Sequence, residues 1–185
     1  GGFVDTSGDG TNDLRIASGV LAFHALAALL AGGISTSRIL LRIGAGLLLV
    51  TLLHAFICTA ELRSALSTGG LGSIFLLGLL VHSVICALVG LSGLLFFRTG
   101  ESWSKRTVII ATNMSCAALI SSLVAMGVSI RLHHADFGRL AVEMLLVCGI
   151  WLVGTVIHRR RDVFATFQAL TFVSAVSVSG WYAGS

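Results

Sequence analysis

Two acidic residues stand in or beside apolar runs of this sequence, and their side chains are the best placed for chemistry. Glu143 lies inside the apolar run 140–157, and Asp162 directly follows a group of arginines. A charge inside an apolar segment is expensive, and a carboxylate there can bind and release protons. Each acid also has a plainer interpretation. Glu143 is an ion-pair candidate for Arg139, four residues earlier, and Asp162 is one for the adjacent Arg161.

Histidines indicate a second possible chemistry, the axial ligation of haem iron. Bis-histidine ligation needs two side chains at matched depth on neighbouring helices. His54 lies near the end of one apolar run and His82 near the middle of the next, while His133 and His134 fall between runs. No clean pair of depths emerges from these positions. His158 ends an apolar run and is a candidate for proton relay, since an imidazole titrates near neutral pH.

Neither the cysteines nor the first residues of the chain predict a metal or cofactor site. The four cysteines are far apart, and each lies inside an apolar run, as expected for reduced, buried side chains. Residues 5–13 begin like a calcium-binding loop. The position that should supply the bidentate glutamate is Ile16, so that ligand is missing. We therefore predict a polar N-terminal arm over residues 1–14, and no cofactor.

The composition indicates that most of these residues are surrounded by lipid rather than by water. Of 185 residues, 56% are hydrophobic and 11% are charged, and there is no proline. The mean hydropathy is +0.98. Because soluble domains carry about a quarter charged residues, the composition argues against a soluble enzyme, a nucleic-acid-binding domain and a disordered tail. We predict an all-α fold, a polytopic membrane protein with five to six transmembrane or steeply tilted helices.

The apolar runs are each long enough, or nearly so, to cross a bilayer core of about 30 Å as a helix. They cover residues 15–34, 38–60, 71–97, 107–130, 140–157 and 163–185. The first three would form a membrane scaffold over residues 15–100. The break between the last two is ambiguous, since residues 158–162 contain neither Gly nor Pro. The alternative is one continuous, tilted helix over residues 139–182.

Basic residues divide unequally between the two ends of such a bundle. If successive connections lie on opposite sides, one side holds eight basic residues and the other holds four. The eight are Arg38, Arg42, Arg98, Lys105, Arg106, Arg159, Arg160 and Arg161. The four are Arg15, Arg63, Arg131 and Arg139. The positive-inside rule then directs the first side toward the cytoplasm or the matrix.

Short motifs in the last third of the chain follow the order found in a known family. Residues 165–172 read Ala-Thr-Phe-Gln-Ala-Leu-Thr-Phe, close to the end of the chain. Upstream, residues 102–106 read Ser-Trp-Ser-Lys-Arg, and residues 113–119 read Asn-Met-Ser-Cys-Ala-Ala-Leu. These motifs resemble those of subunit a of the F-type (mitochondrial) ATP synthase, and the resemblance covers about residues 101–185.

The resemblance implies a stator subunit of a rotary ATP synthase, with residues 101–185 as a proton-translocating helical hairpin. It implies that Arg106 is the fixed guanidinium facing the rotor ring and that Gln168 orients it. A hairpin turning near Asp136 would place these two side chains at similar depth, because they stand 30 residues before and 32 residues after the turn. Two half-channels would carry protons to and from the ring. The residues expected along the proton path are Asn113, Glu143, His158 and Asp162.

The resemblance also implies partners and a location. A c-ring, other membrane subunits and lipids would surround the chain in the mitochondrial inner membrane, and no nucleic acid would bind. Arg38, followed by Arg42 four residues later, is a competing candidate for the functional arginine. Two other classes of function remain open. One is a haem- or quinone-binding membrane anchor of a respiratory complex, and the other is a purely structural accessory subunit.

Overall fold

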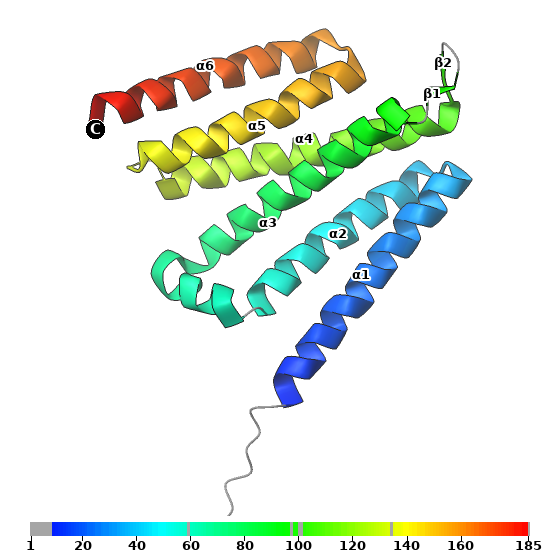
Figure 1. Ribbon diagram of the computed structural model, residues 1–185, viewed down its shortest axis with the longest axis horizontal. Coiled ribbons are helices and arrows are strands. Elements are labelled where there is room, and N and C mark those ends of the chain that lie inside the picture. The colour runs from blue at the N-terminus through cyan, green and yellow to red at the C-terminus, as the bar shows by residue number, and fades with distance from the viewer. Residues whose placement is uncertain (1–8, 59, 97, 100–101, 134, 185) are drawn as a thin grey trace, which may run out of the picture.

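The structure is a computed structural model that describes residues 9–58, 60–96, 98–99, 102–133 and 135–184. Within them the chain forms long helices joined by short connections (Figure 1). The helices are α1 (Asp9–Ser35), α2 (Arg38–Cys58), α3 (Ala60–Phe96), α4 (Lys105–His133), α5 (Phe137–His158) and α6 (Arg161–Gly184). Two-residue strands, β1 (Arg98–Thr99) and β2 (Ser102–Trp103), pair antiparallel between α3 and α4. All six helices are long and apolar enough to cross a membrane. The predicted all-α, multi-pass membrane fold is therefore confirmed.

Successive helices run in opposite directions, so the bundle has two chemically different ends. Helices α2, α4 and α6 begin at one end, which we call the basic end, and α1, α3 and α5 begin at the opposite end. The eight basic residues assigned to one side by the sequence all belong to segments at the basic end. The predicted division of the basic residues between the two ends of the bundle is therefore confirmed.

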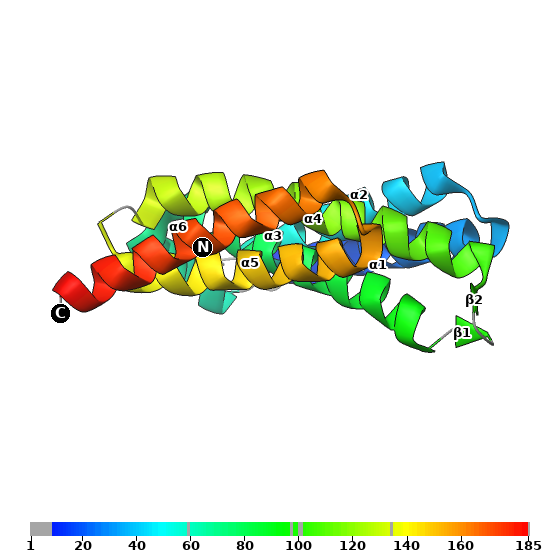
Figure 2. The same ribbon diagram turned by 90° about the horizontal axis from the view of Figure 1, so that it is seen from above.

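Helices α3, α4 and α5 share the main core, and α1 and α6 flank it. Cys86, Leu119 and Val147 come from these three helices and pack together in one buried cluster. In Figure 1, α1 and α6 lie on opposite outer sides of the bundle, and in Figure 2, seen from above, α6 lies in front of the other helices. The most apolar stretches of α1 and α6 are only 11% and 17% buried, compared with 50% in α3. Their outer faces are therefore apolar surfaces suited to lipid.

Helices α1 and α2 approach each other closely through two glycines. A Cβ atom added to Gly44 would lie 2.9 Å from the backbone nitrogen of Leu29. One added to Gly32 would lie 2.8 Å from the backbone nitrogen of Leu41. No real Cβ tolerates such distances from backbone, so the separation of these helices requires glycine at both positions.

The ambiguous break near the end of the chain is a turn. Arg159 adopts a left-handed conformation, with φ 50° and ψ 33°, and its N–H donates to the Thr155 carbonyl at 2.9 Å. This conformation ends α5, and α6 packs back along it as a hairpin (Figure 1). The alternative of one continuous helix over residues 139–182 is therefore wrong. A left-handed arginine has no signal in the sequence, since glycine usually takes that position.

Helix ends also differ from the predicted ends. Helix α1 begins at Asp9, so the polar arm predicted over residues 1–14 is helical in its second part, and residues 1–8 lie outside the described residues. Helix α4 continues to His133, three residues beyond the predicted end of that span. Polar residues at these ends extend the helices beyond the apolar segments from which they were predicted.

Candidate functional site

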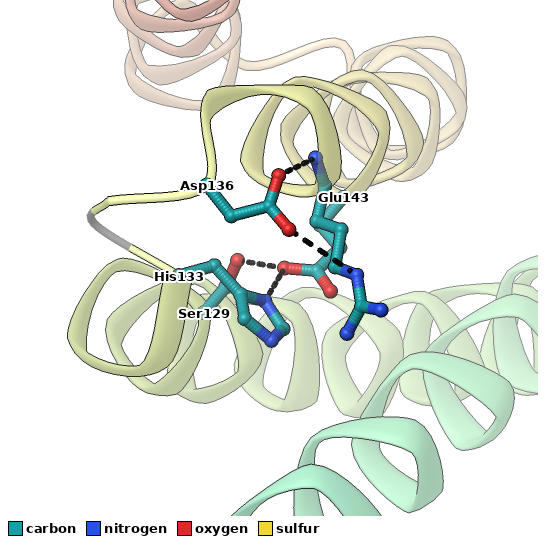
Figure 3. Close-up of polar contacts among 5 residues, drawn as sticks. Ser129, His133, Asp136 and Glu143 are labelled. Carbon is teal, nitrogen blue, oxygen red and sulfur yellow. Dashed lines mark hydrogen bonds and ion pairs between the residues drawn. The ribbon is translucent and has the colours of Figure 1, made fainter. Parts of the chain in front are cut away.

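Glu143 of α5 meets two polar side chains of α4, and these three residues form the site that we call the Glu143 cluster (Figure 3). Ser129 Oγ donates a short hydrogen bond to Glu143 Oε2, and His133 Nδ1 lies 3.0 Å from the same oxygen. Ser129 and His133 are four residues apart and therefore share one face of α4. The connection at Asp136 turns the chain so that this face meets the second turn of α5.

The turn itself is fixed by the N-terminal cap of α5. Asp136 Oδ1 accepts a hydrogen bond from the backbone N–H of Arg139 at 3.1 Å, and Asp136 Oδ2 lies 3.3 Å from Arg139 Nε. A carboxylate at this position satisfies a backbone donor that the helix leaves unpaired and favours the positive end of the helix dipole. Asp136 thereby fixes the start of α5, and Glu143 follows seven residues later, in the second turn of the helix.

The Glu143 cluster is largely withdrawn from solvent although it carries ionisable groups. The side chains of His133 and Glu143 are 14% and 16% exposed, and Ser129 is fully buried. All three belong to segments long and apolar enough to span a membrane. A largely enclosed carboxylate that has a hydroxyl and an imidazole on one oxygen can exchange a proton with the imidazole without backbone movement.

The partners of both acids differ from those suggested by the sequence. Arg139 pairs with Asp136 rather than with Glu143, in an exposed contact at the hairpin turn. Asp162 pairs with Arg160 rather than with Arg161, through bonds of 3.0 and 2.8 Å to its two oxygens. That second pair is more than 60% exposed on both sides. The two acids therefore occupy different environments, and only Glu143 is enclosed.

Arg106 and Gln168 are not brought together, and the predicted alignment of these two side chains is wrong. His158 Nε2 lies 3.9 Å from Cys116 Sγ, which fixes the register between α4 and α5. From this level Arg106 lies about 15 Å further toward the basic end, at 1.5 Å per residue. Gln168 lies about 10 Å in the opposite direction, because α6 returns along α5. The two exposed side chains are thus separated by roughly 25 Å along the bundle axis.

The remaining proton-path candidates lie toward the basic end, away from the Glu143 cluster. Asn113 is buried, accepts a hydrogen bond from Arg42 Nε at 3.3 Å and donates one to the Ile109 carbonyl at 2.8 Å. His158 is half-buried beside Cys116. The structure therefore divides the predicted path into one site near the α4–α5 turn and a second group of residues near the start of α4.

Of the residues that form these contacts, the sequence does not single out Ser129, and it indicates different roles for His133 and Arg42. An apolar run that ends at residue 130 places His133 in a connection, whereas the helix continues to His133. The spacing of four between Ser129 and His133, directly before a helical hairpin, was the signal that could have identified them. The contact of Arg42 with Asn113 joins α2 to α4 and had no local signal, because it depends on tertiary packing.

The histidines considered as possible haem ligands, His54 and His82, already use ring nitrogens in contacts with protein atoms. His82 Nδ1 lies 2.7 Å from Ser121 Oγ, and His82 Nε2 lies 2.9 Å from the Ala45 carbonyl. His54 Nδ1 lies 2.8 Å from Ser18 Oγ. Among the described residues, no three His, Cys, Asp or Glu side chains form a group that could hold a metal ion. Iron ligation by His82 would therefore break its contacts with two helices.

The chain was compared with protein families, curated proteins and solved structures, and no relative was found. The resemblance to subunit a of the rotary ATP synthase therefore rests on the short motifs of the sequence alone.

Proposed function

We propose that this chain is a proton-translocating membrane subunit and that Glu143 is the group that takes up and releases the proton. The observation that carries the proposal is the environment of Glu143. Its carboxylate lies in a membrane-spanning segment, is 16% exposed, and has a hydroxyl and an imidazole on the same oxygen. Intramembrane carboxylates are rare because they are expensive, and they mark proton and ion pathways in membrane proteins.

Proton transfer through this cluster needs only side-chain atoms. When Glu143 is ionised, Ser129 Oγ–H and a protonated His133 Nδ1 both donate to Oε2. The proton on Nδ1 can cross the 3.0 Å contact to Glu143 and return along it. His133 is the last residue of α4, and its other ring nitrogen can exchange protons toward that end of the bundle. The imidazole would thus connect the enclosed carboxylate with water at the membrane surface.

The sequence resemblance supplies a more specific setting for the proposal. In that setting the chain is a stator subunit of a rotary ATP synthase in the mitochondrial inner membrane, and a c-ring is its main partner. The motifs around Arg106 and Gln168 support this setting, whereas the separation of the two side chains along the bundle counts against the usual pairing. Proton transfer at Glu143 does not depend on which complex holds the chain.

Proton flux through the purified protein in liposomes tests the proposal. We expect Glu143→Gln to reduce the flux driven by a pH difference by about tenfold or more, because the amide keeps the shape but cannot ionise. Asp162→Asn is the matched control and should leave the flux near that of the wild type, since Asp162 is exposed and paired with Arg160. Equal flux in wild type and Glu143→Gln would overturn the proposal and favour a structural role.

The rotary setting has a separate test. Gentle solubilisation of native membranes, followed by isolation of this chain, should recover a c-ring and the catalytic α and β subunits. Recovery of dehydrogenase or cytochrome subunits without a c-ring would reject the rotary setting. The liposome measurement would still decide whether Glu143 carries protons.

A further inference from the structure

A cavity of about 160 Å³ opens between α2 and α4, away from the Glu143 cluster. Helix α2 contributes Arg38 and Arg42 to its wall, and α4 contributes Thr112 and Asn113 beside the apolar Val108 and Ile109. Since each water in the liquid takes up about 30 Å³, the cavity has room for a group considerably larger than one water. Its wall combines two cations, two neutral polar groups and an apolar side.

Both arginines line the same cavity, and among the described residues neither has an acidic partner. They are four residues apart at the start of α2 and therefore share one helix face. Across the described part of the chain, no carboxylate lies within ion-pair distance of either guanidinium. Arg42 Nε donates to Asn113 Oδ1 at 3.3 Å, which orients the guanidinium, and within the described residues its terminal N–H groups are left for another acceptor. Two neighbouring guanidiniums with free donors are suited to a phosphate group, which accepts several hydrogen bonds at once.

The position of the cavity indicates the source of the phosphate. Arg38 is the first residue of α2, and Lys105 and Arg106 begin α4 at the same end of the bundle. Headgroup phosphates lie at the ends of membrane-spanning helices, and basic side chains there attract anionic lipids. Ile39 and Ile43, the neighbours of the two arginines on α2, are 70% and 50% exposed and offer apolar surface to acyl chains. A free phosphate ion would make no use of that surface.

We propose that this cavity binds the phosphate group of an anionic phospholipid, with Arg38 and Arg42 on the phosphate oxygens and Asn113 holding Arg42 in place. The lipid would lie at the boundary between α2 and α4, with its acyl chains along Ile39 and Ile43. This site is separate from Glu143 and does not depend on the proton-transfer proposal.

Lipid titration of the purified protein in detergent tests the site. The probes are phosphatidylglycerol and phosphatidylcholine with identical acyl chains, and binding is followed by native mass spectrometry. We expect the wild type to prefer phosphatidylglycerol. Arg38→Gln and Arg42→Gln should each weaken that binding by roughly tenfold, because each removes charge-assisted hydrogen bonds. Arg38→Lys and Arg42→Lys should retain more of the binding than the glutamine variants, since they keep the charge.

Two controls keep this test decisive. Arg139→Gln removes an exposed arginine at the other end of the bundle and should leave lipid binding unchanged. The melting temperature of each variant without lipid separates loss of the site from loss of the fold. Equal binding of phosphatidylglycerol by wild type and by folded Arg38→Gln and Arg42→Gln would overturn the proposal. Displacement of the lipid by an equal concentration of inorganic phosphate would overturn the assignment to a lipid.

Discussion

A single carboxylate, that of Glu143 on α5, joins two helices by contacting Ser129 and His133 of α4. The Ser129 side chain is buried on α4, and its hydroxyl donates to the Glu143 carboxylate on α5 rather than to a carbonyl of its own helix. Most other buried serines here instead donate to a carbonyl of the preceding turn, as Ser83 and Ser174 do. Only a hydrogen bond between helices, like that of Ser129, links separate parts of the fold, whereas a hydrogen bond within one helix does not.

Ser129→Ala should therefore destabilise the protein more than the same change at another buried serine. It removes a donor to a charged acceptor, so we expect a loss of about 1–3 kcal/mol in the free energy of unfolding. Ser174→Ala is the matched control. Ser174 is 3% exposed, and its hydroxyl donates only within α6, to the Leu170 carbonyl at 2.8 Å. Denaturant titration in detergent compares the two variants, and equal losses would contradict the link between α4 and α5.

At the scale of the helix, close approach depends on small residues at defined positions. The sequence shows Gly44 and Gly46 as equivalent, since both lie in the same apolar run. The structure distinguishes them. A Cβ at Gly44 would lie 2.7 Å from Leu29 Cγ, whereas a Cβ at Gly46 would meet nothing within 4 Å.

Gly44→Ala should push α1 and α2 apart, whereas Gly46→Ala should not. Overpacking at a close helix contact costs about 1–3 kcal/mol, and we expect the melting temperature of Gly44→Ala to fall accordingly. Alanine is a better helix former than glycine by up to about 1 kcal/mol, so Gly46→Ala should be neutral or slightly more stable. A lower melting temperature for Gly46→Ala than for Gly44→Ala would contradict the described packing of α1 on α2.

The helices themselves could largely be predicted from the sequence, but their ends and partners could not. Long apolar runs predict the membrane-spanning segments because a helix that crosses the hydrocarbon core needs about 20 consecutive apolar residues. The turn at Arg159 could not be predicted, since neither glycine nor proline marks it. The pairing of Glu143 with His133 was also missed, because it depends on where α4 ends and on the register of the hairpin. Asp162 was given equal standing with Glu143 from the sequence, and only tertiary structure shows that it is exposed.

At the scale of the whole molecule, the hairpin of α5 and α6 returns the chain to the end of the bundle at which α4 ends, so the two helix ends should lie on one side of the membrane. Helix α4 ends at His133 and α6 at Gly184, whereas α1 ends at the basic end with Ser35. The basic end should face the cytoplasm or the matrix, since basic residues are retained on that side.

Labelling of single cysteines tests this topology. Ala135→Cys and Ala183→Cys, each in a background without the four native cysteines, should react with a membrane-impermeant maleimide from the same side. Ser35→Cys should react only from the other side. A continuous last helix crossing the membrane would instead place Ala183→Cys on the side of Ser35→Cys, and that result would contradict the turn at Arg159.

The central claim is that Glu143 binds and releases a proton, and infrared difference titration of the protein in lipid observes that event most directly. The account predicts a pH-dependent carbonyl band of a protonated carboxylic acid in the wild type. The band should be lost in Glu143→Gln and retained in Asp162→Asn. A Glu143→Gln spectrum that keeps every pH-dependent carboxyl band of the wild type would contradict the account.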